Sequence, residues 1–197
     1  MRILFQGDSI TDCHRDREDF NSLAGYTLKV KEILGGDHEY INRGISGDTA
    51  KMVLDRYETD IKAINPDIMT ILIGVNDVWR FHDSNRYTSP QEYYNNLENI
   101  ILNTKKDCPN VKIVLIEPFL LPSPERLPWR CELIQMIDAC RALAVKYADG
   151  FIPIDGFFAK ECLTTPWAEL SADGVHPTDK GNDLIAKYVA EELKRFL

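Results

Sequence analysis

The sequence predicts an open, doubly wound α/β/α sandwich, in which helices cover both faces of a parallel sheet. Two observations carry this prediction. Short apolar runs alternate with longer segments of helical periodicity along the chain, and two of the runs, residues 68–73 and 111–116, are almost continuously apolar. Strands of this kind are buried on both faces, which is typical of parallel sheets. No internal repeat or linker interrupts the pattern, so we expect one domain over residues 1–197.

Five short apolar runs are the expected strands. The first is residues 3–5, and the second is a brief run at residues 40–41. Residues 68–73 and 111–116 supply the third and the fourth, and residues 151–154 form a weaker fifth. Because strand and helix signals alternate, successive strands should run parallel and be joined by crossover helices.

The first two connecting segments carry clear helix signals. Residues 26–34 end at Gly35-Gly36, a common stop at a helix C-terminus. Residues 49–64 place apolar side chains at helical spacing and stop before Pro66. A residue that precedes proline avoids helical backbone, so this helix should end there.

Capping signals mark the remaining helices. Residues 89–92, with the sequence Ser-Pro-Gln-Glu, form a capping box with proline at the first helical position. They predict a helix that runs to about residue 106. Another helix should cover residues 129–147, and Thr178 is placed to cap a last helix that runs to Phe196.

Composition excludes several classes of function. The formal net charge is −8 and no basic run is present, so nucleic acid and anionic membranes are not expected partners. The five cysteines are scattered and form no C-x-x-C pair, which argues against a disulfide framework or a zinc site. The first apolar stretch, residues 3–5, is too short for a signal peptide, and no run approaches membrane-spanning length. We therefore expect a cytoplasmic protein.

Four short polar loops are the places to look for chemistry. Active sites of open parallel sheets form at the carboxyl ends of the strands, where the strand order reverses. Residues 7–11, 44–48 and 74–77 directly follow the first three expected strands. Residues 173–177 lie just before the last helix. If the fold is correct, these loops meet at one edge of the sheet.

Three residues in these loops have the chemistry of a catalytic triad. Ser9 is a hydroxyl nucleophile, which needs a base before it can attack an acyl group. His176 can be that base because its pKa lies near neutrality. Asp173 lies three residues earlier and is placed to hold the imidazole tautomer, while Pro177 favours an extended backbone at His176.

The same loops offer donors for an oxyanion hole, which must be aimed at the negative charge that develops during acyl transfer. We expect three of them: the backbone N–H groups of Ser9 and Gly47 and the side-chain amide of Asn76. Gly47 also allows the chain to approach a ligand closely, because it has no side chain. Together with the triad, these donors predict an acyl-transfer site.

The sequence resembles the SGNH (GDSL) hydrolase family. The four blocks of that family appear here in order: Gly-Asp-Ser at 7–9, Gly47, Gly-x-Asn-Asp at 74–77 and Asp-x-x-His at 173–176. One Gly-Asp-Ser triplet would be weak evidence, but four blocks in the expected loops are specific. The resemblance implies a flavodoxin-like sheet of five parallel strands in the order 2-1-3-4-5. It also implies ester hydrolysis without a metal or an organic cofactor.

A closer likeness indicates the substrate. Residues 5–13, 44–47, 76–80 and 118–119 are similar to intracellular acetyl-xylan esterases, which remove acetyl groups from xylo-oligosaccharides or xylosides. The likeness implies a small acetylated sugar as the substrate and assembly into more than a monomer. It fails at Ala172, where those enzymes carry tryptophan just before the catalytic aspartate.

Three further residues are candidates for binding the alcohol part of the ester. Trp79 and Arg80 follow the asparagine block, and Trp129 follows a proline-rich stretch. An aromatic face can cover a sugar ring, and a guanidinium can donate to hydroxyl groups. The alternative for the tryptophans is an ordinary place in the core.

Several acidic residues near the blocks have simpler interpretations. Asp12, His14 and Asp16 fit no metal-ligand template, so we expect a solvated, charged loop. Asp8 and Asp77 are expected to stabilise their loops rather than to act in catalysis.

Other functions remain open. A flavodoxin-like module that binds a phosphate ligand would share the fold, but the sequence has neither a P-loop nor a dinucleotide fingerprint. A lysophospholipase or an acyl-thioesterase would share the triad. Residues 74–89 and 117–128 are polar or rich in proline rather than apolar. A long acyl chain needs an apolar groove or lid, so these segments favour a short acyl group.

Overall fold

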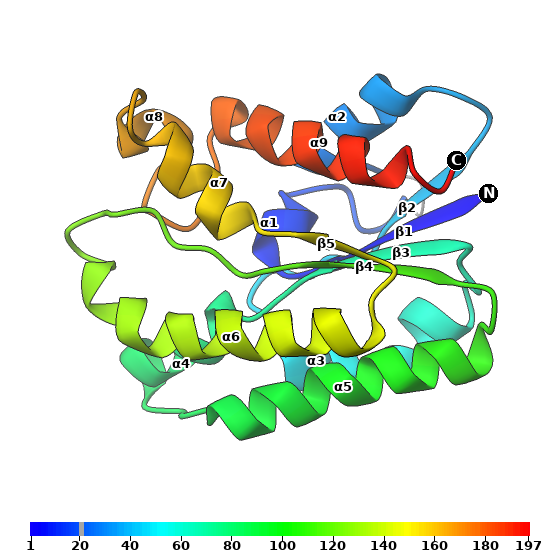
Figure 1. Cartoon of the computed structure of the whole chain (residues 1–197), viewed down its shortest axis with the longest axis horizontal. Coiled ribbons are helices and arrows are strands. Elements are labelled where there is room, and N and C mark those ends of the chain that lie inside the picture. Colours follow the sequence, from blue (N-terminus) through cyan, green and yellow to red (C-terminus); the bar gives the residue numbers. More distant parts are fainter. Residues whose placement is uncertain (20–21) are drawn as a thin grey trace.

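The computed structural model describes residues 1–19 and 22–197 and has a five-stranded parallel sheet at its centre (Figure 1). The strands are hydrogen-bonded in the order β2-β1-β3-β4-β5. They are β1 (Arg2–Gly7), β2 (Glu39–Asn42), β3 (Ile68–Leu72), β4 (Lys112–Ile116) and β5 (Gly150–Ile152). Both the α/β sandwich and its strand order are thereby confirmed.

Helices cover the two faces of the sheet as separate layers (Figure 1). One layer holds α1 (Ser9–Asp12), α2 (Gly25–Leu34), α7 (Ile154–Glu161), α8 (Trp167–Leu170) and α9 (Asp179–Leu193). The other holds α3 (Ala50–Asp55), the π-helical turn η1 (Glu58–Lys62), α4 (Val75–Ser84), α5 (Pro90–Asp107), the 3₁₀ turn η2 (Leu127–Trp129) and α6 (Arg130–Tyr147). Within the layers, α2 packs on α9 and α5 packs on α6. No helix among the described residues is long and apolar enough to cross a bilayer.

The expected capping residues begin the helices. The Ser89 hydroxyl accepts a hydrogen bond from the Glu92 backbone N–H at 3.1 Å, and Pro90 occupies the first turn of α5. The Thr178 hydroxyl accepts one from the Gly181 N–H at 3.3 Å at the start of α9. Each hydroxyl satisfies a backbone donor that has no partner within its helix.

The predicted helix over residues 49–64 is interrupted. Helix α3 ends at Asp55, and the chain continues through Arg56 into the π-helical turn η1. The guanidinium of Arg56 turns back to donate to Asp48 and Gln6, at 2.7 and 2.8 Å. Apolar spacing gave no signal for this tertiary contact.

Four helices lie where the sequence indicated none, and one of them, α1, falls in the expected loop of residues 7–11. Residues 74–89 were expected to form a polar loop, yet they contain α4, whose buried face includes the polar side chains of Asn76 and Asp77. Val75, Val78 and Trp79 do lie at helical spacing, so a signal was present, but the segment is short and mostly polar and follows a loop motif. Helices α7 and α8 were also missed, and α7 begins at Ile154, inside the predicted fifth strand.

Strand β1 lies between β2 and β3, so the chain leaves it in one direction for β2 and later returns on the other side for β3. This reversal opens a crevice at the carboxyl ends of β1 and β3. The loops that follow β1, β2 and β3 therefore meet at this edge of the sheet.

Candidate active site

A tight turn places Ser9 directly after β1. Asp8 caps helix α1 by accepting a hydrogen bond from the Ile10 N–H at 3.0 Å, and Ser9 is the first residue of that helix. A Cβ atom at Gly7 would lie 2.3 Å from the Thr11 hydroxyl oxygen and 2.5 Å from the Leu72 carbonyl oxygen. Glycine is therefore needed for β1 to pass this close to β3 and turn toward the crevice.

The loop that carries Asp173 and His176 is closed on itself. The Ser171 hydroxyl donates to the His176 carbonyl at 2.8 Å and accepts from the Gly174 N–H at 2.9 Å. The Ala172 N–H also donates to the His176 carbonyl, at 3.0 Å. Gly174 has a φ of +91°, a conformation that favours glycine. These contacts fix the backbone between the two candidate catalytic residues.

The three candidate triad residues lie in one line of hydrogen bonds. The Ser9 Oγ atom is 2.9 Å from His176 Nε2, and His176 Nδ1 is 2.9 Å from Asp173 Oδ2. An ionised aspartate can only accept, so Nδ1 carries a proton and donates it to Asp173. In the neutral ring, Nε2 is then the free acceptor that faces the Ser9 hydroxyl.

The electrostatics of this pair favour a charged aspartate and a basic histidine. Burial alone would raise the pKa of the Asp173 carboxyl, but the His176 ring and the backbone N–H groups of Val175 and His176 donate to it and hold that pKa well below its ordinary value. The hydrogen bond to Asp173 raises the pKa of His176 above its ordinary value. His176 is therefore a stronger base than a free imidazole.

The proposed oxyanion donors surround the mouth of the same site. Gly47 has a φ of +89°, and the Asn76 side-chain amide lies in the first turn of α4, where one of its N–H groups donates to the Asp48 carbonyl at 3.0 Å. The second amide N–H donates to no group in residues 1–19 and 22–197 and can donate to a ligand. These residues open on a cleft of about 500 Å³, lined by Ser9, His14, Ser46, Gly47, Asn76, Trp79, Arg80, Asp83 and His176.

The three candidate alcohol-binding residues do not all reach this cleft. Trp79 lines it, with its ring 5.8 Å from that of His176. Arg80 also lines it and donates to the Gly47 carbonyl at 3.2 Å and to Asp83 at 2.7 Å. Trp129 is only 7% exposed and packs edge-on against Trp79, with 5.2 Å between the rings. Trp129 is thus behind the wall of the cleft.

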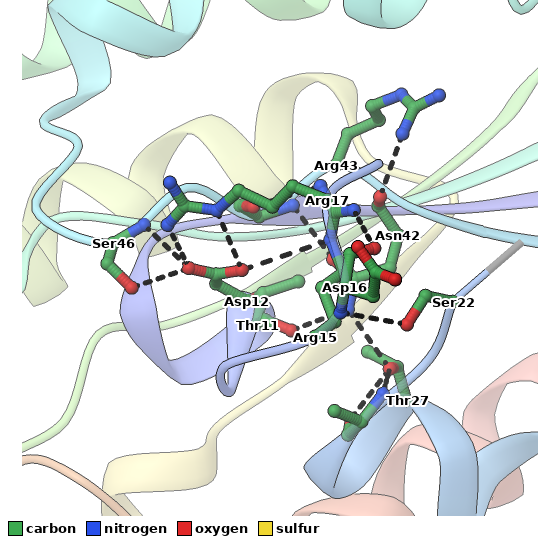
Figure 2. A network of polar contacts seen from close by, with 12 residues as sticks. Thr11, Asp12, Arg15, Asp16, Arg17, Ser22, Thr27, Asn42, Arg43 and Ser46 are labelled. Atoms are coloured by element: carbon green, nitrogen blue, oxygen red, sulfur yellow. Dashed lines mark hydrogen bonds and ion pairs between the residues drawn. The ribbon is translucent and has the colours of Figure 1, made fainter. Parts of the chain in front are cut away.

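The prediction of a solvated loop around Asp12 is wrong (Figure 2). Asp12 is 1% exposed, and one carboxylate oxygen accepts both the backbone N–H and the hydroxyl of Ser46, while the carboxylate also pairs with Arg17. Burial raises the pKa of Asp12, but these hydrogen bonds outweigh burial and hold that pKa below its ordinary value. Asp16 is exposed as expected, and His14 is exposed at the cleft. The sequence did contain one signal that Asp12 lies near the site. Asp12 comes three residues after Ser9, a spacing that places the two side chains on the same face of a helix.

Two buried carboxyl groups lie beside the site without lining the cleft. The second oxygen of Asp8 has no hydrogen-bond partner among the described residues, and neither has one oxygen of Asp77. The other Asp77 oxygen accepts from the Ala50 N–H at 3.0 Å, at the start of α3. Burial raises the pKa of Asp8 and of Asp77 to about 7 in each case. These backbone contacts fit the structural role that the sequence suggested for both aspartates.

The comparisons with known proteins agree with this geometry. The model of the GDSL-like lipase/acylhydrolase family matches residues 5–184. The chain is 33% identical over 207 positions to an acetylxylan esterase from Geobacillus stearothermophilus, covering 98% of this chain and 93% of that protein. It is 26% identical to a thioesterase, protease and lysophospholipase from Escherichia coli, covering 98% of this chain and 83% of that protein.

The same likeness is seen in three dimensions. A solved structure of a variant of Axe2, an acetyl xylan esterase from Geobacillus stearothermophilus, superposes with a TM-score of 0.88 at 31% identity. The match covers 98% of this chain and 94% of that one. The chain therefore belongs to the GDSL-like lipase/acylhydrolase family and is a carboxylic ester hydrolase.

Proposed function

We propose that this protein is a serine esterase that removes short acyl groups, above all acetyl, from a carbohydrate such as a xylo-oligosaccharide. The observation that carries the proposal is the unbroken line of hydrogen bonds from Ser9 through His176 to Asp173, which opens on a cleft with oxyanion donors at its edge. Serine, histidine and aspartate in this arrangement are the parts that acyl transfer requires.

The first half of the reaction forms an acyl-enzyme. His176 Nε2 accepts the proton of the Ser9 hydroxyl as the oxygen attacks the ester carbonyl carbon. The charge on the imidazolium is stabilised by Asp173. The oxygen of the tetrahedral intermediate accepts hydrogen bonds from the backbone N–H groups of Ser9 and Gly47 and from the Asn76 amide. When the intermediate collapses, the C–O bond to the alcohol breaks and His176 gives its proton to the leaving oxygen.

The second half releases the acid. A water molecule enters the cleft. His176 accepts a proton from this water as the water oxygen attacks the acyl carbon on Ser9. The same donors stabilise the second oxyanion. Collapse breaks the bond to Ser9, and His176 returns the proton to the serine oxygen. The products are a short carboxylic acid and a free alcohol.

The lining of the cleft supports a short acyl group. Trp79 is the one large apolar side chain among the described residues that line it, and the others are polar, charged or glycine. A long acyl chain gains about 0.8 kcal/mol for each methylene that a matching apolar groove buries. This cleft offers little such surface, so added methylenes remain in water.

The same lining suits a sugar as the alcohol part of the ester. Trp79 presents an aromatic ring, and Arg80, Asp83 and His14 offer donors and acceptors around it. An apolar ring face beside polar groups matches a pyranose, which has a C–H face and hydroxyls at its rim. Trp129 contributes indirectly because it supports Trp79. The acetylxylan esterase relative fits this assignment.

The test combines a nucleophile variant with a series of substrates. Ser9→Ala should lower kcat on p-nitrophenyl acetate by on the order of 10³-fold or more. Wild-type kcat/KM should fall from two-carbon to ten-carbon p-nitrophenyl esters, and acetate should be released from acetylated xylosides. A rate that climbs with chain length would favour the lysophospholipase or thioesterase alternative. Hydrolysis of acetate esters without release from any acetylated sugar would remove the carbohydrate from the proposal.

A further inference from the structure

A cation outside the four family blocks contacts the catalytic machinery. Arg126 comes from the proline-rich segment between β4 and α6, and its guanidinium carbon lies 4.1 Å from the Trp79 ring centre and 4.3 Å from that of Trp129. Its Nη2 atom is 3.9 Å from Asp173 Oδ2, the oxygen that accepts the His176 proton. One side chain therefore touches both the cleft wall and the catalytic acid.

We infer that Arg126 is a positioning residue that keeps His176 available as a neutral base and holds Trp79 in place as the wall of the cleft. The inference rests on the proposed function, because His176 matters as a base only if the protein transfers acyl groups. This role could not be predicted from the sequence, because Trp79, Asp173 and His176 lie far from Arg126 in the chain.

The segment that carries Arg126 is tied to the acid–base loop. The Ser123 hydroxyl donates to the Asp173 carbonyl at 3.2 Å and accepts from the Arg126 N–H at 3.3 Å. The Leu121 N–H donates to the Gly174 carbonyl at 2.8 Å. Movement of the Arg126 backbone relative to the Asp173 loop would break these contacts, so the segment holds the base of this side chain beside Asp173.

Stacking rather than hydrogen bonding holds the guanidinium itself. Its Nε–H is buried and finds no acceptor among the described residues. Both indoles flank the planar cation, which is attracted to the electron-rich faces of the rings. Because Trp79 lines the cleft and Trp129 supports it from behind, loss of the cation would loosen this wall.

The charge of Arg126 opposes that of Asp173 at His176. Asp173 raises the pKa of His176 through its hydrogen bond and its charge, the charge of Asp8 acts in the same direction, and Arg126 lowers that pKa. Arg80 and Asp83, which also line the cleft, pair with each other at 2.7 Å, and His14 is the further titratable residue of the lining. Arg126 thus limits how tightly the imidazolium is held, so that His176 can release its proton to the leaving alcohol.

Two variants separate the charge from the stacking. Arg126→Met keeps a long side chain against the indoles but removes the charge, and Arg126→Lys keeps the charge but loses the planar stack. We expect Arg126→Met to move the His176 titration upward by about 0.5 pH unit, the size of a modest, partly screened Coulomb effect. At pH well below that titration, kcat/KM for p-nitrophenyl acetate should then fall about threefold, with little loss at pH 9. Arg126→Lys should keep the wild-type pH dependence and raise KM for an acetylated xyloside.

The titration is read without turnover, from the ring proton signals of His176 in NMR spectra of the full chain, assigned with His176→Gln. This readout decides the inference even if the proposed acetyl-sugar substrate and the serine mechanism fail. Arg195→Met is the matched control, since Arg195 pairs with Glu192 near the C-terminus. A His176 titration that stays in place in Arg126→Met would overturn the inference. So would an equal loss of kcat/KM at every pH, which would indicate a general disturbance of the fold.

Discussion

Ser46 donates both its backbone N–H and its hydroxyl to one oxygen of the Asp12 carboxylate, at 3.1 and 2.5 Å. Asp12 lies on the helix that begins with Ser9, the proposed nucleophile, and Ser46 directly precedes Gly47. A buried carboxylate thus links the loop of the proposed oxyanion hole to the helix of Ser9. On the other side of this loop, Arg56 holds Asp48.

We expect Asp12→Asn to impair turnover more than substrate binding. The amide keeps the size of the side chain but loses the charge that attracts both donors of Ser46, so Gly47 is free to shift. A displacement of about 1 Å from productive geometry can cost on the order of 10²-fold in rate. We predict a fall in kcat of about 10- to 100-fold on p-nitrophenyl acetate, with KM nearly unchanged.

Arg17→Met is the control for Asp12→Asn. Arg17 pairs with the same carboxylate from an exposed position, and its loss leaves the contacts to Ser46 intact. Its kcat should stay near that of the wild type. An Asp12→Asn protein with wild-type kcat would show that Asp12 does not position the loop.

Asn76→Ala tests charge stabilisation directly. If the Asn76 amide acts on the tetrahedral oxyanion, its loss should lower kcat by about 10²- to 10³-fold and leave KM almost unchanged. The variant also loses the hydrogen bond to the Asp48 carbonyl, so its melting temperature should be compared with that of the wild type. A change confined to KM would mean that Asn76 binds the substrate in its ground state only.

The pH profile should report His176. Its pKa is raised above the ordinary 6.5 by the hydrogen bond to Asp173, and only the neutral ring can accept the Ser9 proton. Activity should therefore rise with pH through an inflection above 6.5. Asp173→Asn removes the charge that raises this pKa, so the inflection should move to lower pH while maximal kcat falls by on the order of 10³–10⁴-fold. An inflection that moves to higher pH in this variant would contradict the assignment.

The free energy of unfolding should fall as pH rises because of Asp77, whereas a carboxylate whose pKa is lowered by an ion pair makes it rise with pH. Burial raises the folded-state pKa of Asp77 from 3.8 to about 7, so the folded protein keeps a proton that the unfolded chain loses. Between these two values the folded state binds more protons, and stability declines as pH rises, by at most about 1.4 kcal/mol per pH unit for one group. Asp77→Asn resembles the protonated form and should escape this decline.

The measurement for Asp77 is urea unfolding at pH 5 and pH 8. The quantity compared is the free energy of unfolding of Asp77→Asn minus that of the wild type. This difference should be more favourable to the variant at pH 8 than at pH 5. Asp55→Asn, at an exposed aspartate paired with Lys51, is the matched control and should show no such gain. If the wild type and Asp77→Asn differ in free energy of unfolding by the same amount at pH 5 and at pH 8, the prediction is wrong.

The parts of the site that follow strands could be predicted from the sequence. Ser9, Gly47 and Asn76 each come soon after an apolar run, and parallel strands bring their carboxyl ends to one edge. His176 and Asp173 lie three residues apart, so their pairing needed only a local turn. The strand order came from the family resemblance, since apolar periodicity does not contain it.

The parts that depend on distant contacts could not be predicted. Asp12 looked solvated because its burial comes from Ser46 and Arg17 folding over it. Trp129 looked like a sugar platform because nothing in its neighbourhood places it behind Trp79. The buried place of Asp77 on α4 also depends on a distant contact, since a backbone N–H of α3 donates to its carboxylate.

The closed loop around Asp173 has an evolutionary consequence. Its backbone is fixed by Ser171 and Gly174, whereas the Ala172 side chain is exposed and only its backbone N–H takes part in the closure. Mutation can therefore exchange the side chain at position 172 without displacing the acid or the base. The geometry of the proposed acid and base and the identity of residue 172 can thus vary independently as the sequence evolves.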